Sequence, residues 1–148
     1  MNTKLMMTAS AIFLAVAGMT LTFLPEEIMQ YTGIGASKAL QLILQLTGAL
    51  YFGFAMLNWM AKGSTIGGIY NRPTAIANFG HFFIGALGLL KAVMKDNSLP
   101  YAIWALAIIY SIFAVLFWLV LSRSPINNQK SKSHSVITEH NKEGALQS

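Results

Sequence analysis

Four apolar stretches follow one another in this chain, and they constrain its fold more than any other feature. They cover residues 5–24, 39–61, 74–94 and 101–121. A helix of about 20 residues is roughly 30 Å long, which matches the thickness of the hydrocarbon core of a bilayer. The sequence therefore predicts an all-α fold, a four-helix transmembrane bundle, with residues 1–121 as its membrane domain.

The composition agrees with this prediction. The 148 residues are 55% hydrophobic and 10% charged, whereas soluble domains have roughly 25% charged residues. The net charge is +5, and the basic residues lie mostly at the ends of the apolar stretches, where they would meet lipid headgroups. We therefore expect membrane lipids as partners and no nucleic acid. The chain has no cysteine, so disulfides and thiolate metal sites are excluded.

The first stretch has two interpretations. Lys4 followed by an apolar run and by Ala15-Val16-Ala17 is typical of a cleavable signal peptide. The apolar run continues through Leu24, however, without the polar residues that usually follow a cleavage site. A retained span is the preferred interpretation, and cleavage is the alternative.

Local signals predict where helices begin and end. Pro25-Glu26-Glu27 can open a short helix at the membrane interface over residues 25–33, and Gly33 can end it. Ser37 is a predicted N-cap for the second span. Ser98, two residues before Pro100, is a predicted cap for the fourth.

The ends of the chain predict its orientation. Residues 122–148 are dominated by Ser, Asn, Gln, Lys, His and Glu, so we predict a disordered polar tail. Four spans place both termini and the loop at 62–73 on one side. Seven basic residues lie on that side and three on the other. The positive-inside rule then predicts a multi-pass membrane protein with both termini in the cytoplasm.

Polar and small residues recur at helical spacing in each stretch. In the third stretch Asn78, His81, Gly85, Gly88 and Ala92 are separated by 3, 4, 3 and 4 residues, which places them on one stripe. Because unpaired polar groups are costly in lipid, we expect such stripes to face the bundle interior. The corresponding lines are Ala11, Ala15, Gly18 and Thr22 in the first stretch, Gln41, Gln45, Gly48, Tyr51 and Asn58 in the second, and Ala107, Ser111, Ala114 and Trp118 in the fourth.

Asn78 and His81 have a structural and a functional interpretation. In the first they bond to polar groups of the second span, with Asn58 the nearest in depth, and only hold the bundle together. In the second they belong to a small polar ligand-binding pocket near the cytoplasmic face, with His81 able to relay or sense protons. Arg72 could hold an anionic group such as a lipid phosphate, or simply anchor the chain at the headgroups. The candidate pocket residues are Asn58, Tyr70, Arg72, Asn78 and His81.

Catalytic and metal sites are not predicted. The apolar stretches contain no Asp or Glu and a single histidine, which is too few for a zinc site or for haem held by two histidines. Glu26 and Glu27 are adjacent on a short helix and point apart. We therefore predict no catalytic residue, no metal and no cofactor.

Residues 48–91, GALYFGFAMLNWMAKGSTIGGIYNRPTAIANFGHFFIGALGLLK, resemble small uncharacterised bacterial membrane proteins with four spans. In size and layout the chain also resembles the DoxX-like group of small four-helix membrane proteins. The resemblance implies a helical bundle in a bacterial inner membrane, and it carries no catalytic residue to transfer.

Three functions follow from these features, in order of preference. The first is a non-enzymatic accessory or binding component that holds a lipid, a small apolar ligand or a partner membrane protein. The second is a transporter or proton-linked membrane subunit that uses His81, as a homo-oligomer because four spans make a narrow bundle. The third is a membrane-embedded enzyme, which the lack of acids in the apolar stretches makes less favourable.

Overall fold

The computed structural model describes residues 3–35, 37–63 and 72–122. Within these ranges the chain forms five helices and no strand, and four of the helices are long and apolar enough to cross a membrane. The all-helical fold class predicted from the sequence is therefore confirmed. The helices are α1 (Thr3–Phe23), α2 (Pro25–Thr32), α3 (Lys38–Ala61), α4 (Arg72–Lys95) and α5 (Tyr101–Ser122). The predicted disordered tail lies outside the described residues except for Ser122, the last residue of α5.

The short helix α2 forms as its sequence predicts. Pro25 occupies its first turn, where a missing backbone N–H costs nothing. Gly33 ends it in the left-handed conformation with φ 69°, which glycine adopts without steric cost. Directly before α3, the predicted cap is also present, because the Ser37 hydroxyl at the N-cap accepts a hydrogen bond from the Leu40 N–H at 3.1 Å.

The predicted cap of α5 is wrong. The backbone N–H and the hydroxyl of Ser98 both donate to Asp96 Oδ1, at 2.9 and 2.6 Å. The carbonyl of Pro100 instead accepts the first hydrogen bond of the helix, from the Ile103 N–H at 2.8 Å. A carboxylate two residues upstream is a stronger acceptor than any group of the helix start, so it holds the serine within the turn.

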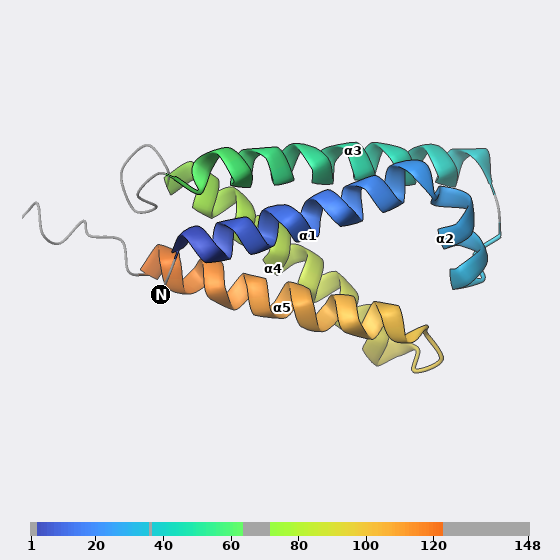
Figure 1. The fold of residues 1–148 in the computed structure, drawn as a ribbon. Coiled ribbons are helices and arrows are strands. Elements are labelled where there is room, and N and C mark those ends of the chain that lie inside the picture. The colour runs from blue at the N-terminus through green and yellow to red at the C-terminus, as the bar shows by residue number, and fades with distance from the viewer. Residues whose placement is uncertain (1–2, 36, 64–71, 123–148) are drawn as a thin grey trace, which may run out of the picture.

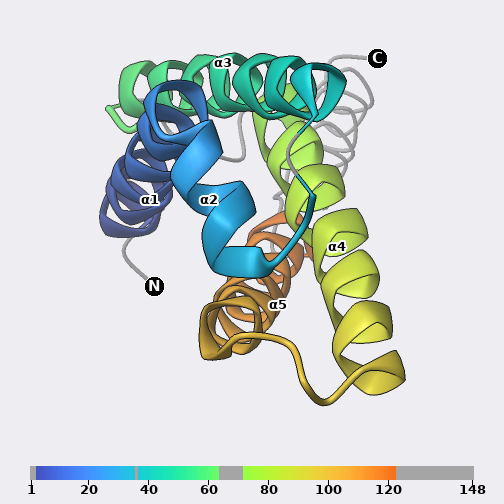
Figure 2. The ribbon, with the colours of Figure 1, turned by 90° about the vertical axis from the view of Figure 1, so that its right-hand side faces the viewer.

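The long helices are arranged as two pairs. α1 packs along α3, and α4 packs along α5, while the contacts between the pairs are few (Figure 1). The two pairs diverge toward the end that carries α2 (Figures 1 and 2). α2 contacts α1 and α3 only, since none of its Cα atoms lies within 8 Å of one in α4 or α5. Any side chain that joins the two pairs therefore determines how they are held together.

Two glycines let α1 and α3 approach closely. A Cβ atom on Gly18 would lie 2.8 Å from the carbonyl oxygen of Gly48, and one on Gly48 would lie 2.6 Å from that of Gly18. Such distances cannot be accommodated without separating the helix backbones. Gly18 and Gly48, which belong to the lines predicted in the first two apolar stretches, therefore lie on the packing seam of this pair.

In the other pair the predicted stripes are only partly correct. Gly88 and Ala92 are exposed, and Trp118 is 56% exposed. Phe82 and Phe117 are fully buried in the interior positions instead. The predicted stripe of α4 repeats every 3.5 residues, whereas a straight helix has 3.6 residues per turn, so the stripe drifts away from the interior by about 20° per heptad.

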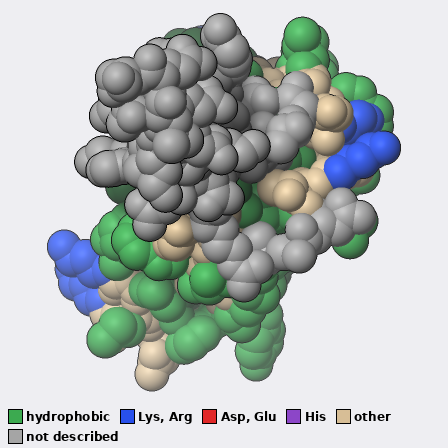
Figure 3. Space-filling model, turned by 90° about the vertical axis from the view of Figure 1, so that its left-hand side faces the viewer, with side chains coloured by type: hydrophobic (Ala, Val, Ile, Leu, Met, Phe, Trp, Pro, Cys, Tyr) green, Lys and Arg blue, Asp and Glu red, His purple; other side chains and the backbone are tan. Residues whose placement is uncertain are grey.

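The outer surface is apolar. Leu46, Met60 and Ile84 are 71%, 78% and 70% exposed, and hydrophobic side chains dominate the visible described surface at one end of the molecule (Figure 3). A soluble monomer rarely exposes apolar area on this scale, because water would drive it to associate. A surface of this kind fits acyl chains as its solvent.

Candidate functional site

Three buried polar side chains, Ser10, Asn58 and Asn78, form one hydrogen-bonded group where the two helix pairs meet. We call this group the amide cluster. Asn58 Nδ2 donates to Asn78 Oδ1 at 2.7 Å, and Asn78 Nδ2 donates back to Asn58 Oδ1 at 2.6 Å. Asn58 Nδ2 also donates to the Ser10 hydroxyl at 3.1 Å. All three residues have no exposed surface. The prediction that Asn58 is the bonding partner of Asn78 is thus confirmed.

The amide cluster has no unused donor. An asparagine amide carries two N–H groups, and those of Asn58 are taken by Ser10 and Asn78. The second N–H of Asn78 bonds to the carbonyl of Thr74 at 2.9 Å, one turn earlier on α4. The Ser10 hydroxyl in turn donates to the Met7 carbonyl at 3.0 Å. A ligand that accepts hydrogen bonds would have to break one of these bonds to gain one, so the cluster is suited to holding α1, α3 and α4 together.

A second polar group, formed by Tyr51, His81 and Tyr110, joins α3, α4 and α5. We call it the aromatic cluster. The Tyr110 hydroxyl donates to the Tyr51 hydroxyl at 2.7 Å, and it lies 3.3 Å from His81 Nε2. Because a tyrosine hydroxyl has one hydrogen, His81 Nε2 donates to Tyr110 when Tyr110 donates to Tyr51. In the other histidine tautomer Nε2 accepts from Tyr110, and Tyr51 must then donate to Tyr110. The cluster is a short chain of groups that both accept and donate hydrogen bonds, so it can rearrange without losing all of its bonds.

Aromatic rings fix the position of His81. Its ring stacks on Phe54 with centroids 5.1 Å apart and meets Tyr51 edge-on at 5.0 Å. Gly85 makes room for the third member of the cluster, because a Cβ atom there would lie 2.6 Å from the Tyr110 ring. His81 is only half-buried, and so is Tyr51. This cluster is therefore less enclosed than the amide cluster.

The five predicted pocket residues do not form a single described group. Asn58 and Asn78 come together, and His81 bonds to Tyr110 instead of either asparagine. Arg72 is exposed at the start of α4, and Tyr70 lies outside the described residues. Asn78 and His81 are three positions apart, so their side chains point about 60° apart around α4 and reach different neighbours.

Two residues of the clusters, Ser10 and Tyr110, were not among the site residues predicted from the sequence. Both lie beside residues of the predicted small-residue lines: Ser10 directly precedes Ala11, and Tyr110 falls between Ala107 and Ala114 at spacings of 3 and 4. A polar group at a helical interface position should have been a signal, because a buried tyrosine hydroxyl needs a partner.

In the described ranges, no three His, Asp or Glu residues gather in a group that could hold a metal ion.

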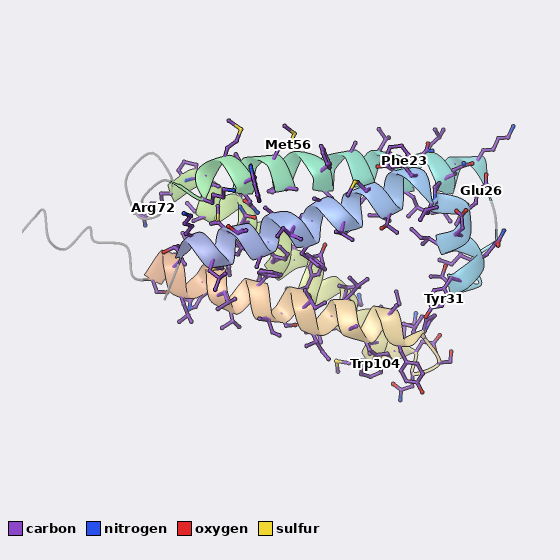
Figure 4. All side chains as sticks on the ribbon, viewed as in Figure 1. Phe23, Glu26, Tyr31, Met56, Arg72 and Trp104 are labelled. Carbon is purple, nitrogen blue, oxygen red and sulfur yellow. The ribbon has the colours of Figure 1, made fainter. Side chains whose placement is uncertain are left out.

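Two apolar grooves run along the outside of the helix pairs. The first, which we call the α1/α3 groove, has a volume of about 250 Å³ and is lined by Ala11, Ile12, Ala15, Phe52, Ala55, Met56, Trp59 and Met60. The second, the α4/α5 groove, has a volume of about 330 Å³ and is lined by Phe79, Phe83, Ala114, Val115 and Trp118. Met56 points outward from α3, away from the other pair (Figure 4). Val115 and Trp118, which line the second groove, are 57% and 56% exposed, so both grooves are on surfaces that would face lipid.

Charge divides the described residues into two unlike ends. Lys4, Lys62 and Arg72 lie at the end where α1 begins, and no acidic residue accompanies them there. Figure 3 shows this end, with basic side chains at its edges and no acidic side chain in view. At the opposite end Glu26, Glu27 and Asp96 balance Lys38, Lys91 and Lys95. Arg72 and Glu26 mark the two ends in Figure 4.

The chain matches no protein-family model, no curated protein and no solved structure. The chemistry of the two clusters and the two grooves is therefore interpreted from their own geometry.

Proposed function

We propose that this chain is a non-enzymatic membrane protein that binds one lipid acyl chain, or a similarly narrow apolar ligand, in the α1/α3 groove. The groove itself is the observation that supports this function most. Its eight lining residues are all apolar, and its volume of about 250 Å³ is slightly below the roughly 300–1,000 Å³ of sites for drug-sized molecules. A narrow, linear, apolar ligand fits such a groove best.

The amide cluster supports the non-enzymatic part of the proposal. Its donors are already bonded within the protein, so the most deeply buried polar groups act as connections between helices. α1, α3, α4 and α5 contain no Asp or Glu, and general acid–base chemistry in proteins commonly uses such groups.

The location we propose is a bacterial inner membrane, with both termini in the cytoplasm. The charge difference between the two ends supports this orientation, because the end where α1 begins carries three basic and no acidic described residues. Membrane lipids are the proposed partners. A second copy or another membrane protein is a further possible partner, and the α4/α5 groove offers an apolar face for it.

Native mass spectrometry tests lipid binding in the groove. We expect one lipid per chain to survive activation that strips the others. Ala15→Phe places a large side chain in the groove, and we expect that lipid to be lost. Val16→Phe is the control, because Val16 is on the same helix, is 55% exposed and does not line the groove. Equal retention in both variants would refute the proposal, as would the absence of any retained lipid in the unmodified protein.

The aromatic cluster favours a second candidate function, a proton-linked subunit of an oligomer. Its three side chains form a hydrogen-bonded chain between the two helix pairs and include the single histidine of the four long helices. Histidine titrates near neutral pH, so it can pass or sense a proton. In vesicles with an internal pH dye, His81→Gln should abolish proton movement. Tyr31→Phe should not, because Tyr31 is 63% exposed on α2. Proton movement equal to that of empty vesicles would exclude this function.

A further inference from the structure

We propose that the ligand of the α1/α3 groove is an anionic phospholipid, with its acyl chain in the groove and its phosphate bound by Lys62. This inference rests on the proposed function and adds the headgroup to it. Three observations carry it: the position of Lys62 on Trp59, the depth of the groove, and the charge of the end at which the groove stops.

Lys62 lies on a residue that lines the groove. It follows Trp59 by three positions and continues the helical conformation at the end of α3, so both side chains share one face. Its ammonium lies 2.8 Å from the centroid of the Trp59 ring. This contact uses one side of the cation, and an ammonium has three N–H donors. The donors directed away from the ring can bind a phosphate oxygen at the mouth of the groove.

The groove lies at the depth that a phospholipid requires. Its α3 residues run from Phe52 to Met60, which corresponds to about 12 Å of helix. One leaflet contributes roughly half of the 30 Å hydrocarbon core, so the groove covers most of the depth of a leaflet. Lys62 follows the last lining residue by two positions, where the ester and phosphate groups of a lipid begin.

The charge of this end favours an anionic headgroup. Lys4 is exposed at the start of α1, and no described acidic residue lies at this end of the bundle. A basic residue near an anionic membrane surface contributes about 1 kcal/mol, which corresponds to about a fivefold change in binding. Removal of Lys62 should therefore reduce the preference for an anionic lipid about fivefold.

The α4/α5 groove is an internal comparison. It is also apolar and also contains a tryptophan, Trp118. Among the described residues, a cation, Lys62, lies over the ring of Trp59, and none lies over the ring of Trp118. We therefore expect acyl chains in the α4/α5 groove to show no comparable headgroup preference.

Lipid competition tests the inference. The full chain is reconstituted with equal amounts of phosphatidylglycerol and phosphatidylcholine that carry the same acyl chains, and retained lipid is identified by native mass spectrometry. We expect about a fivefold excess of phosphatidylglycerol. Lys62→Gln should remove the excess and leave the total retention unchanged. Lys95→Gln, at the opposite end of the bundle, should change neither quantity.

The outcomes separate this inference from the proposed function. If the unmodified chain retains both lipids equally, the headgroup inference fails and acyl-chain binding stands. If it retains neither lipid, the proposed function fails. If Ala15→Phe fills the groove but the excess of phosphatidylglycerol persists, Lys62 is only a surface anchor and the inference fails. Two controls complete the test. The Lys62→Gln variant must unfold at the same temperature as the unmodified chain, which shows that it is folded. Glycerol phosphate must not compete with the lipid, which shows that the acyl chain is needed for binding.

Discussion

The amide cluster and the aromatic cluster both join the two helix pairs, but they differ in enclosure and in bonding. Ser10, Asn58 and Asn78 have no exposed surface, and the two asparagines bond reciprocally at 2.6 and 2.7 Å. In the aromatic cluster Tyr51 and His81 are half-buried, and the bond of His81 to Tyr110 is longer, at 3.3 Å.

The difference indicates separate roles for the two clusters. A reciprocal amide pair has one arrangement that satisfies all of its groups, so it specifies how α3 and α4 meet. A chain of hydroxyls and an imidazole has two arrangements, one for each histidine tautomer. We therefore expect the amide cluster to determine stability and the aromatic cluster to tolerate change.

The largest effect is expected for Asn78→Leu. The variant leaves the Asn58 carbonyl oxygen and one of its two amide N–H groups without a partner in a buried site, and unsatisfied buried groups cost about 1–3 kcal/mol each. We expect a loss of about 2–3 kcal/mol in the free energy of unfolding, which denaturant titration in detergent would measure. A loss smaller than that of the tyrosine variant below would contradict the contrast.

A double-mutant cycle sharpens this prediction. Replacing both partners with apolar residues of similar shape can be nearly neutral. Asn58→Leu combined with Asn78→Leu should therefore destabilise the chain by less than the sum of the single variants. Strict additivity of the two free-energy changes would mean that the two amides do not act as a pair.

A smaller effect is expected for Tyr110→Phe. The variant removes the hydroxyl that joins Tyr51 and His81 but keeps the ring that packs against Phe82 and Gly85. Polar contacts within membranes average about 0.6 kcal/mol, and both former partners are only half-buried. We expect a loss of about 1 kcal/mol in the same unfolding measurement. A loss above that of Asn78→Leu would reverse the assigned roles.

The smallest effect is expected in the turn between α4 and α5, which contributes to neither cluster. Hydrogen bonds from the side chain and the backbone N–H of Ser98 hold the pKa of Asp96 below its ordinary value. A lowered pKa contributes stability that is present above the unfolded pKa and lost as the pH falls through the folded pKa. Ser98→Ala should raise the pKa of Asp96 toward its ordinary value and reduce this pH dependence.

Carboxyl NMR can follow this change directly. Asp96 is the single aspartate of the chain, so aspartate labelling gives one titrating signal. Ser37→Ala is a suitable control, because it removes a helix cap elsewhere and should leave the titration of Asp96 unchanged. An Asp96 pKa that is equal in Ser98→Ala and the unmodified chain would contradict the role of the turn. Because Asp96 is exposed, we expect the accompanying change in stability to be slight.

Part of the candidate site could be predicted from residue spacing and depth. Asn58 lies near the end of the second apolar stretch and Asn78 near the start of the third, so both lie at a similar depth on one side of the membrane. This shared depth predicted the bond between them. The partner of His81 could not be found in this way. Tyr110 lies 29 positions away from His81, and its hydroxyl reaches the imidazole only because Gly85 lets the tyrosine ring lie against α4.

The amino-acid sequence by itself determined the number, length and apolar character of the membrane-length helices. In hydrocarbon the backbone must form its hydrogen bonds internally, which favours helices, and a helix needs about 20 apolar residues to cross the core of the bilayer. Only the tertiary structure decided that these helices associate as two diverging pairs, with separate polar clusters and a groove that ends at Lys62. The reason is that an apolar side chain has almost the same free energy against lipid as in the interior of the helix bundle. Pairing therefore depends on where small residues permit close approach and where polar groups meet across the interface.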